Sequence, residues 1–292
     1  MKTKMKKKKN ALPYLFLAPA IFVIIAIFAI PLVNLLWYSF AKVDLIGNFR
    51  SWAGFSNYKY LFTEAFAQTM VRTLIWVVFG IAGIFVVGTA LALALNKPIP
   101  GRGFFRAVVI IPWVIPHVFA GTMWSWVLNS TNGIVNTLLL EIGLIKQPIS
   151  FLGPDFALAT VIFIRIWKGV PFWVMSLLSA LQTIPFEVEE AARLDGAVGL
   201  RYFWHITLPL LRPVMIMSGT ILMAWSFTIF DLIYVITGGG PLNATELLSI
   251  TIYKKAFINA DLGGASAIAI FTMVFVSIIA FFLMKHNAKE EN

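Results

Sequence analysis

Long apolar segments alternate with short polar connections along most of the chain. Each segment reaches the roughly 20 residues that a helix needs to cross the hydrocarbon core of a bilayer. There are six of them, at 13–39, 69–96, 104–128, 156–182, 206–236 and 264–284. The pattern predicts an all-α fold, an integral membrane bundle of six spanning helices.

The most polar stretch lies between the fourth and fifth apolar segments. It runs from Glu187 to Pro209 and contains four acidic residues and two arginines. An insert this short and polar cannot cross a bilayer, so we expect it in water or against a partner. Carboxylates in the first turns predict a helix over 186–194, which ends at Asp195-Gly196. A second short helix is expected over 198–207, before Pro209 in the first turn of the fifth spanning helix.

Composition supports the membrane class and excludes several others. Hydrophobic residues make up 60% of the chain and charged residues 12%, with a mean hydropathy of +0.86. Cysteine is absent, which excludes disulfides and cysteine nucleophiles. The net charge of +10 does not predict nucleic-acid binding, because the cations lie beside apolar segments and no hydrophilic domain carries a basic face.

The distribution of Lys and Arg predicts the orientation, because positively charged connections stay in the cytoplasm. With the N-terminus inside, fourteen cations are cytoplasmic and seven external. The cytoplasmic set is Lys2, Lys4, Lys6, Lys7, Lys8, Lys9, Lys97, Arg102, Arg106, Arg193, Arg201, Arg212, Lys285 and Lys289; the external set is Lys42, Arg50, Lys59, Arg72, Lys146, Lys254 and Lys255. We therefore expect a basic cytoplasmic N-terminus (1–12), a transmembrane domain (13–285) with a cytoplasmic insert at 186–209, and a cytoplasmic tail (286–292). The first apolar segment is too long for a signal peptide and is interpreted as an uncleaved helix.

The polar insert carries a specific motif. Glu190-Ala191-Ala192 is followed after three residues by Gly196, and after nine more by Ile206-Thr207-Leu208-Pro209. This resembles the EAA signature of permease subunits of bacterial and archaeal ABC importers. The resemblance implies a type I permease fold in which this segment is the coupling helix, held in a cleft of the ATP-hydrolysing subunit. The residues that it assigns to coupling are Glu190, Ala191, Ala192, Asp195, Gly196, Ile206, Leu208 and Pro209.

Other residues resemble the carbohydrate branch of these permeases and extend the match over nearly the whole chain. They include Ile166-Trp167-Lys168, Pro171-Phe172, Asn129, Asn136 and the segment Thr237–Pro241. The resemblance implies import of a sugar, or a related polyol or sugar phosphate, across the cytoplasmic membrane. It also implies four kinds of partner: a second permease, two ATPase subunits, an extracytoplasmic solute-binding protein and the lipid bilayer. No Walker A pattern occurs, so the chain is expected not to be an enzyme and to bind no cofactor, with ATP and Mg²⁺ held by the ATPase.

Ionisable residues inside spanning helices are costly unless paired or hydrated, and the candidates for a functional role among them are Arg165, Lys168 and Asp231. Their depths permit an Arg165–Asp231 pair across the bundle. Either these groups, with Trp167, line a water-filled substrate pathway, or the charges form a structural ion pair. Pro112, Pro116, Gly169 and Pro171 interrupt or loosen the third and fourth helices, which favours a polar pathway near the midplane.

Two other functions are compatible with a membrane bundle. An ion-coupled secondary transporter would use Asp231 as its proton or sodium site, but it leaves the motif spacing unexplained. A membrane-embedded enzyme needs a cluster of catalytic groups, and none is visible. The three histidines, His117, His205 and His286, fall in different segments without metal-ligand spacing, so no metal site is predicted. Within the importer class, another small organic solute is the main alternative to a sugar.

Overall fold

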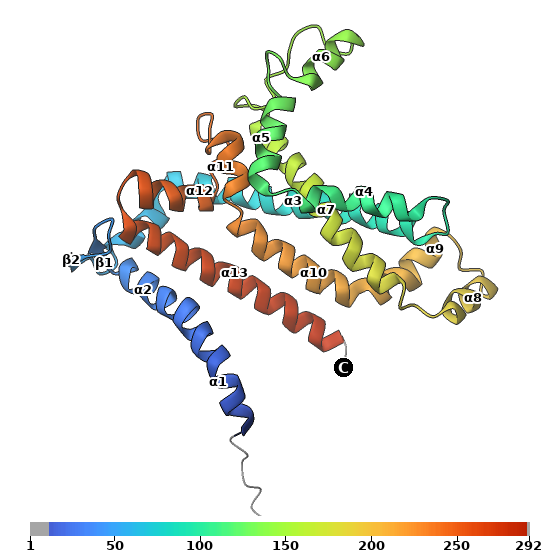
Figure 1. Ribbon diagram of the computed structural model, residues 1–292, viewed down its shortest axis with the longest axis horizontal. Coiled ribbons are helices and arrows are strands. Elements are labelled where there is room, and N and C mark those ends of the chain that lie inside the picture. The colour runs from blue at the N-terminus through green and yellow to red at the C-terminus, as the bar shows by residue number, and fades with distance from the viewer. Residues whose placement is uncertain (1–11, 291–292) are drawn as a thin grey trace, which may run out of the picture.

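The computed structural model describes residues 12–290, and it is almost entirely helical (Figure 1). Most of the predicted basic N-terminus, 1–11, and the last two residues lie outside the described residues. Five continuous helices are long and apolar enough to cross a membrane: Phe16–Ser39, Glu64–Asn96, Ala157–Leu181, Leu200–Thr228 and Leu262–Lys285. With a bent helix pair counted as one more, the described chain has the six predicted spans. The prediction of an all-α membrane bundle is confirmed.

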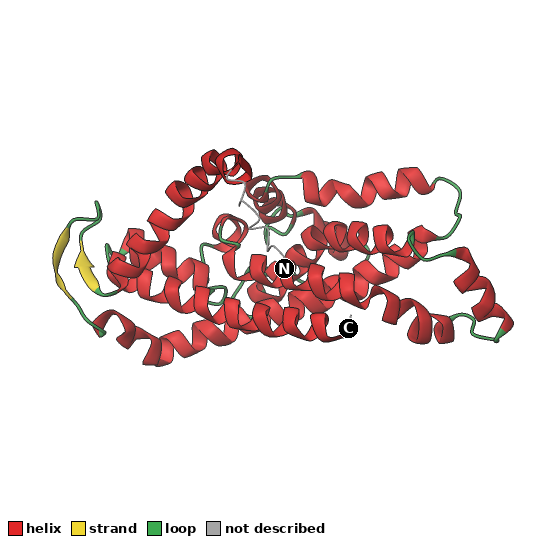
Figure 2. Cartoon of the chain, turned by 90° about the horizontal axis from the view of Figure 1, so that it is seen from below, coloured by secondary structure: helices red, strands yellow, loops and turns green. Residues whose placement is uncertain are grey.

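The first span is built from α1 (Leu12–Ile24), a π-helical turn (Ile25–Ala29) and α2 (Ile30–Ser39). A hairpin follows, in which β1 (Ala41–Val43) pairs antiparallel with β2 (Phe49–Trp52). A 3₁₀ turn (Ser56–Phe62) leads into α3 (Glu64–Asn96). The hairpin lies at one end of the elongated molecule, as Figure 2 also shows, and the polar insert lies at the other.

α7 (Ala157–Leu181) is the central helix of the rest of the chain, and it packs against α3, α4 and α10. Before it come α4 (Arg102–Val114), α5 (His117–Val127) and α6 (Ile134–Glu141). After it come α8 (Phe186–Leu194), α9 (Leu200–Tyr202), a π-helical turn (Phe203–Thr207) and α10 (Leu208–Thr228). The chain closes with α11 (Asp231–Thr237), α12 (Leu248–Tyr253), a third π-helical turn (Lys254–Ile258) and α13 (Leu262–Glu290).

The third predicted helix, 104–128, is not one straight element. α4 and α5 meet at an angle of 98°. The break follows from Pro116, because a residue that precedes proline is pushed out of the helical region. Ile115 accordingly has ψ 124°, and Pro116 serves as the N-cap of α5.

The fifth predicted segment, 206–236, has different bounds in the structure. Its helix starts at Leu200, so the expected short helix over 198–207 is fused to the span. A π-helical turn precedes Pro209: Leu208 donates its N–H to Phe203 O, five residues back, immediately before the residue that has no N–H to donate. The helix ends at Thr228, since Ile229 is extended, and Asp231 therefore begins a separate helix, α11.

The core lies between α3 and α7, which pack closely along their length. Trp173 of α7 is fully buried, its ring stacks on Phe85 of α3 at 3.9 Å, and its Nε1 donates to Thr89 Oγ1 over 3.0 Å. Gly88 allows this approach, because a Cβ there would lie 2.5 Å from Cδ1 of Trp173. The first span is different. Its most apolar stretch buries no residue within the chain, although α2 packs against α13.

Candidate functional site

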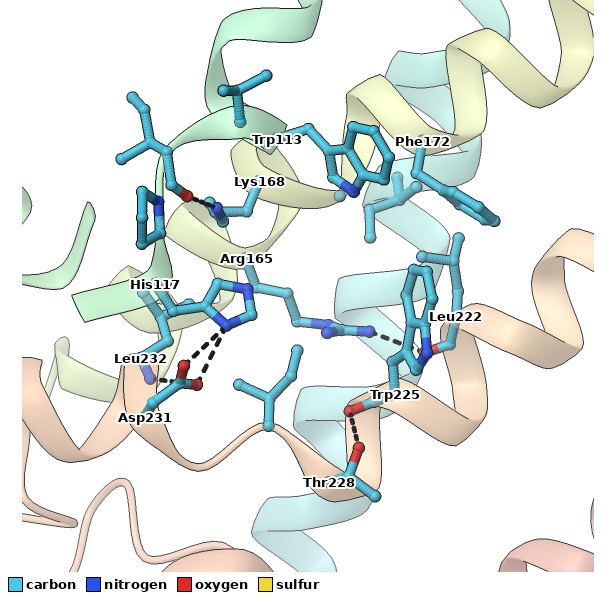
Figure 3. A pocket seen from close by; sticks show the side chains of 16 residues that line it. Trp113, His117, Arg165, Lys168, Phe172, Leu222, Trp225, Thr228, Asp231 and Leu232 are labelled. Atoms are coloured by element: carbon cyan, nitrogen blue, oxygen red, sulfur yellow. Dashed lines mark hydrogen bonds and ion pairs between the residues drawn. The ribbon is translucent and has the colours of Figure 1, made fainter. Parts of the chain in front are cut away.

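A cavity of about 500 Å³ lies where the α4–α5 bend faces α7 and α10 (Figure 3). The bend contributes residues from both of its arms, and the end of α10 and the start of α11 close the opposite side. The lining side chains with polar or aromatic groups are Trp113, His117, Arg165, Lys168, Phe172, Trp225, Thr228 and Asp231. Three of the four predicted pathway residues, Arg165, Lys168 and Asp231, therefore face one space.

Arg165 connects three helices. Its guanidinium donates from Nη2 to Leu222 O at 3.3 Å and to Ser226 Oγ, both on α10. The guanidinium carbon also lies 5.0 Å from the centre of the Trp76 ring on α3, a cation–π contact. The residue is only 3% exposed. These contacts turn most of the guanidinium toward the protein.

Lys168 donates hydrogen bonds to backbone carbonyls at the α4–α5 break. Its Nζ donates to Pro112 O at 2.9 Å and also to Ile115 O. In an uninterrupted helix, Pro112 O would accept the N–H of residue 116. That residue is proline and has no N–H, so the ammonium group of Lys168 takes the place of the missing donor.

Asp231 pairs with His117 and not with Arg165. His117 Nδ1 lies 3.1 Å from each carboxylate oxygen of Asp231, and the N–H of Leu232 donates to Asp231 Oδ1 at 2.9 Å. The Arg165–Asp231 pair that the sequence left possible does not form, because the helix ends at Thr228 and Asp231 begins a separate helix beside α5. Sequence reasoning missed His117. The sequence signal that could have identified it is its position directly after Pro116, at the break in the predicted helix.

Trp167 does not line this cavity. Its ring packs edge-on against Trp124 of α5, with ring centres 5.5 Å apart. Three other aromatic rings line the cavity instead, those of Trp113, Phe172 and Trp225. Trp113 is 55% exposed and Trp225 43% exposed, and the ring centres of Phe172 and Trp225 lie 5.0 Å apart. The cavity therefore presents accessible aromatic faces beside a His–Asp pair and the hydroxyl of Thr228.

The polar insert forms a helix, a glycine bend and a second helix, as predicted, and lies at the far end of the molecule (Figure 1). α8 ends in a Schellman motif. Gly196 has φ +72° and donates its N–H to Arg193 O at 3.1 Å, while Ala197 donates to Ala192 O at 2.8 Å. Glu190 and Ala191 are exposed, but Ala192 is only 3% exposed and faces the chain. Of the two alanines of the motif, only Ala191 is therefore open to contact by another protein.

The other coupling candidates lie around this bend. Asp195 is exposed and serves as the C-cap of α8. Ile206 and Leu208 are half-buried and Pro209 is exposed, all on the long helix that contains α10. Large apolar side chains at the tip are exposed, among them Phe186, Leu194, Val198, Leu200 and Trp204. An apolar surface of this kind marks a contact with another protein or with the membrane.

A second cavity, about 1130 Å³, lies between this insert and the C-terminal ends of α3 and α7. Its lining includes Asn96, Gln182, Glu189, Arg193 and Trp204. The insert is therefore joined to the bundle by its two chain connections, with space between it and the helices above. Such an element can change its angle without repacking the core.

Comparison with known proteins identifies the family. Residues 84–290 match the family described as the binding-protein-dependent transport system inner membrane component. The chain belongs to this family. The match includes the bent pair, the whole cavity and the polar insert, and it begins within α3.

Relatives of this inner membrane component align over nearly their whole length. The trehalose/maltose transport system permease protein of Thermococcus litoralis is 33% identical over 276 residues, which cover 94% of this chain and 92% of that protein. The sulfoquinovosyl glycerol transport system permease protein of Agrobacterium fabrum is 34% identical over 261 residues, with 89% and 84% covered. A solved bacterial ABC transporter for import of the acidic polysaccharide alginate has the same fold, with a TM-score of 0.79, 24% identity and 97% and 96% covered. The predicted resemblance to importer permeases is confirmed, and this inner membrane component is a multi-pass membrane protein.

Proposed function

We propose that this chain is a permease subunit of an ATP-driven ABC importer that moves a sugar, or a related small polyol or sugar phosphate, across the cytoplasmic membrane. The observation that carries the proposal is the protruding insert, with its glycine bend and exposed apolar tip, in a chain of this transport family. Relatives named for sugar and sugar-derivative transport support the solute class.

The proposal includes the partners. Two ATPase subunits hydrolyse ATP with Mg²⁺, and one of them receives the tip formed by α8 and α9. A second permease covers helix surface that this chain leaves unburied, above all on the first span. An extracytoplasmic binding protein delivers the solute. The chain itself binds no cofactor, and both its termini lie in the cytoplasm, which the excess of Lys and Arg on that side supports.

One continuous helix connects the coupling insert to the cavity. It runs from Leu200 to Thr228, 29 residues, or about 43 Å at 1.5 Å per residue. Leu200 is at the exposed tip, whereas Leu222 and Trp225 line the cavity. When ATP binding closes the ATPase dimer, a pull on the insert is transmitted along this helix and turns the cavity outward. Hydrolysis resets the cavity toward the cytoplasm.

The cavity recognises the solute chiefly through its aromatic rings, because Arg165 and Lys168 are engaged with protein oxygens. Trp113, Trp225 and Phe172 offer flat apolar faces on which a sugar ring can stack. Thr228 and the His117–Asp231 pair add hydrogen-bonding groups for hydroxyls.

Replacing Trp225 tests this arrangement. Trp225→Ala is expected to lower the rate of solute uptake about tenfold at subsaturating solute, since lost stacking of about 1.4 kcal/mol corresponds to that factor. Radiolabelled uptake by cells carrying the complete transporter measures the effect. Trp126→Ala is the matched control, because Trp126 is 81% exposed and does not line the cavity. Equal rates in both variants would contradict a recognition role for Trp225.

The function itself is tested by purifying the tagged chain in mild detergent from its native membranes. We expect an ATPase and a second permease to copurify, and mass spectrometry to identify them. The same complex in proteoliposomes should take up solute only with ATP and the binding protein. Recovery of the chain alone, with gradient-driven uptake that Asp231→Asn abolishes, would instead support the secondary transporter considered above.

A further inference from the structure

The bend between α4 and α5 leaves backbone carbonyls without helical donors at the wall of the cavity. Pro112 O loses its helical donor because residue 116 is proline, and Ile115 lies outside the helical region. Unpaired carbonyls inside a membrane are costly, so a sharp break needs donors from elsewhere in the protein. In this structure the donor for both carbonyls is the ammonium group of one side chain, Lys168.

The burial and the hydrogen bonds of Lys168 fit the role of a donor to these carbonyls. Its side chain is buried, at 7% exposure, and two of the three N–H donors of an ammonium group are used on Pro112 O and Ile115 O. Among the described residues it forms no ion pair with a carboxylate within 4.0 Å. The partial negative charges of the two carbonyls compensate its charge, together with the carboxylate of Asp231 in the same cavity.

We propose that Lys168 is a positioning residue, which holds the α4–α5 bend and so shapes the cavity wall that carries Trp113 and His117. The two residues lie on opposite sides of the break, and both line the cavity. The His117–Asp231 pair fastens the second arm to α11, but it lies beyond the break and does not satisfy the carbonyls at it. Among the described residues, Lys168 is the side chain that donates to both of these carbonyls. This inference extends beyond the proposed function and rests on the geometry of the bend.

The bend can be measured directly with spin labels. The chain contains no cysteine, so Phe104→Cys on α4 and Trp126→Cys on α5 introduce two unique labelling positions, both on exposed residues. In a straight helix, these positions would lie about 33 Å apart, whereas a right-angled bend brings them to roughly 20 Å. Double electron–electron resonance on the full chain in nanodiscs distinguishes the two.

With Lys168 present, we expect one narrow distance distribution at the bent value. Lys168→Met removes the donors and is expected to broaden the distribution and shift its mean by several ångströms toward the straight value. Lys168→Gln, which keeps a polar amide donor and is the milder change, is expected to fall between the two. It also provides a second test if Lys168→Met fails to fold.

Arg165→Met is the matched control, because it removes the other buried cation of α7, whose partners lie on α10 and not at the bend. The spin-label distance distribution of this variant should stay at the value of the bent helix pair. An unchanged bend in Lys168→Gln and Lys168→Met, or an equal shift in Arg165→Met, would overturn the proposal. The measurement requires no transport, so its failure is separate from any failure of the proposed import function.

Discussion

Gly196→Val is expected to uncouple ATP hydrolysis from solute uptake. Gly196 closes the Schellman motif of α8 with φ +72°, a conformation that costs L-residues about 1–2 kcal/mol and β-branched ones more. No atom lies within 4 Å of a Cβ at this position, so the effect comes from backbone strain and not from a clash. A cost of that size shifts the population of the native bend by a factor of about 5–30. The ratio of solute transported to phosphate released should fall correspondingly.

The measurement is made on the reconstituted importer in proteoliposomes, with uptake and phosphate release followed in the same sample. Gly54→Val is the matched control, because Gly54 also has positive φ, +53°, and open space around its Cβ position, but it follows the β1–β2 hairpin, at the opposite end of the molecule from the insert. It should leave the ratio near the wild-type value. A wild-type ratio in an assembled Gly196→Val complex would contradict the proposed role of the bend in coupling.

The second large effect is expected at the α3–α7 contact. A Cβ at residue 88 would lie 2.5 Å from Cδ1 and 3.2 Å from Cβ of Trp173. Trp173 cannot yield, since it is fully buried, stacked on Phe85 and hydrogen-bonded to Thr89. Gly88→Val therefore has to separate the helices, and overpacking of this kind costs about 1–3 kcal/mol.

Thermal unfolding in detergent, followed by size-exclusion chromatography, measures this loss. The melting temperature of Gly88→Val should fall by roughly 5 °C, with a smaller yield of monodisperse protein. Gly103→Val serves as the control, because it adds the same side chain to a helix where no atom lies within 4 Å of the new Cβ. Equal melting temperatures for the two variants would show that α3 and α7 can repack around the added volume.

Prolines show how far local sequence can be used to infer structure. Pro112 and Pro116 together predicted an interruption of the third helix, and the chain does break at Pro116. The same type of residue has a different outcome at Pro171, where α7 continues unbroken. Proline removes one hydrogen bond in both cases. The surrounding helices decide whether the chain bends or stays straight.

The charged residues show where sequence reasoning ends. Their place in apolar segments singled out Arg165, Lys168 and Asp231, because ionisable groups need partners inside a membrane. Their partners were not predictable. Leu222 O, Ser226 Oγ, Pro112 O and His117 lie 50 or more residues away in the chain, and three of these four acceptors or donors carry no formal charge that a sequence pattern could reveal.

The sequence by itself determined the membrane class, the approximate spans and the family, because apolar length and a short spaced motif are local properties. Only the tertiary structure decided which face of each helix meets the cavity. Trp167 and Lys168 are adjacent in the chain, yet one packs against Trp124 and the other joins the α4–α5 bend. That choice depends on how helices pack and where they break, and it is made by contacts between segments that are distant in the sequence.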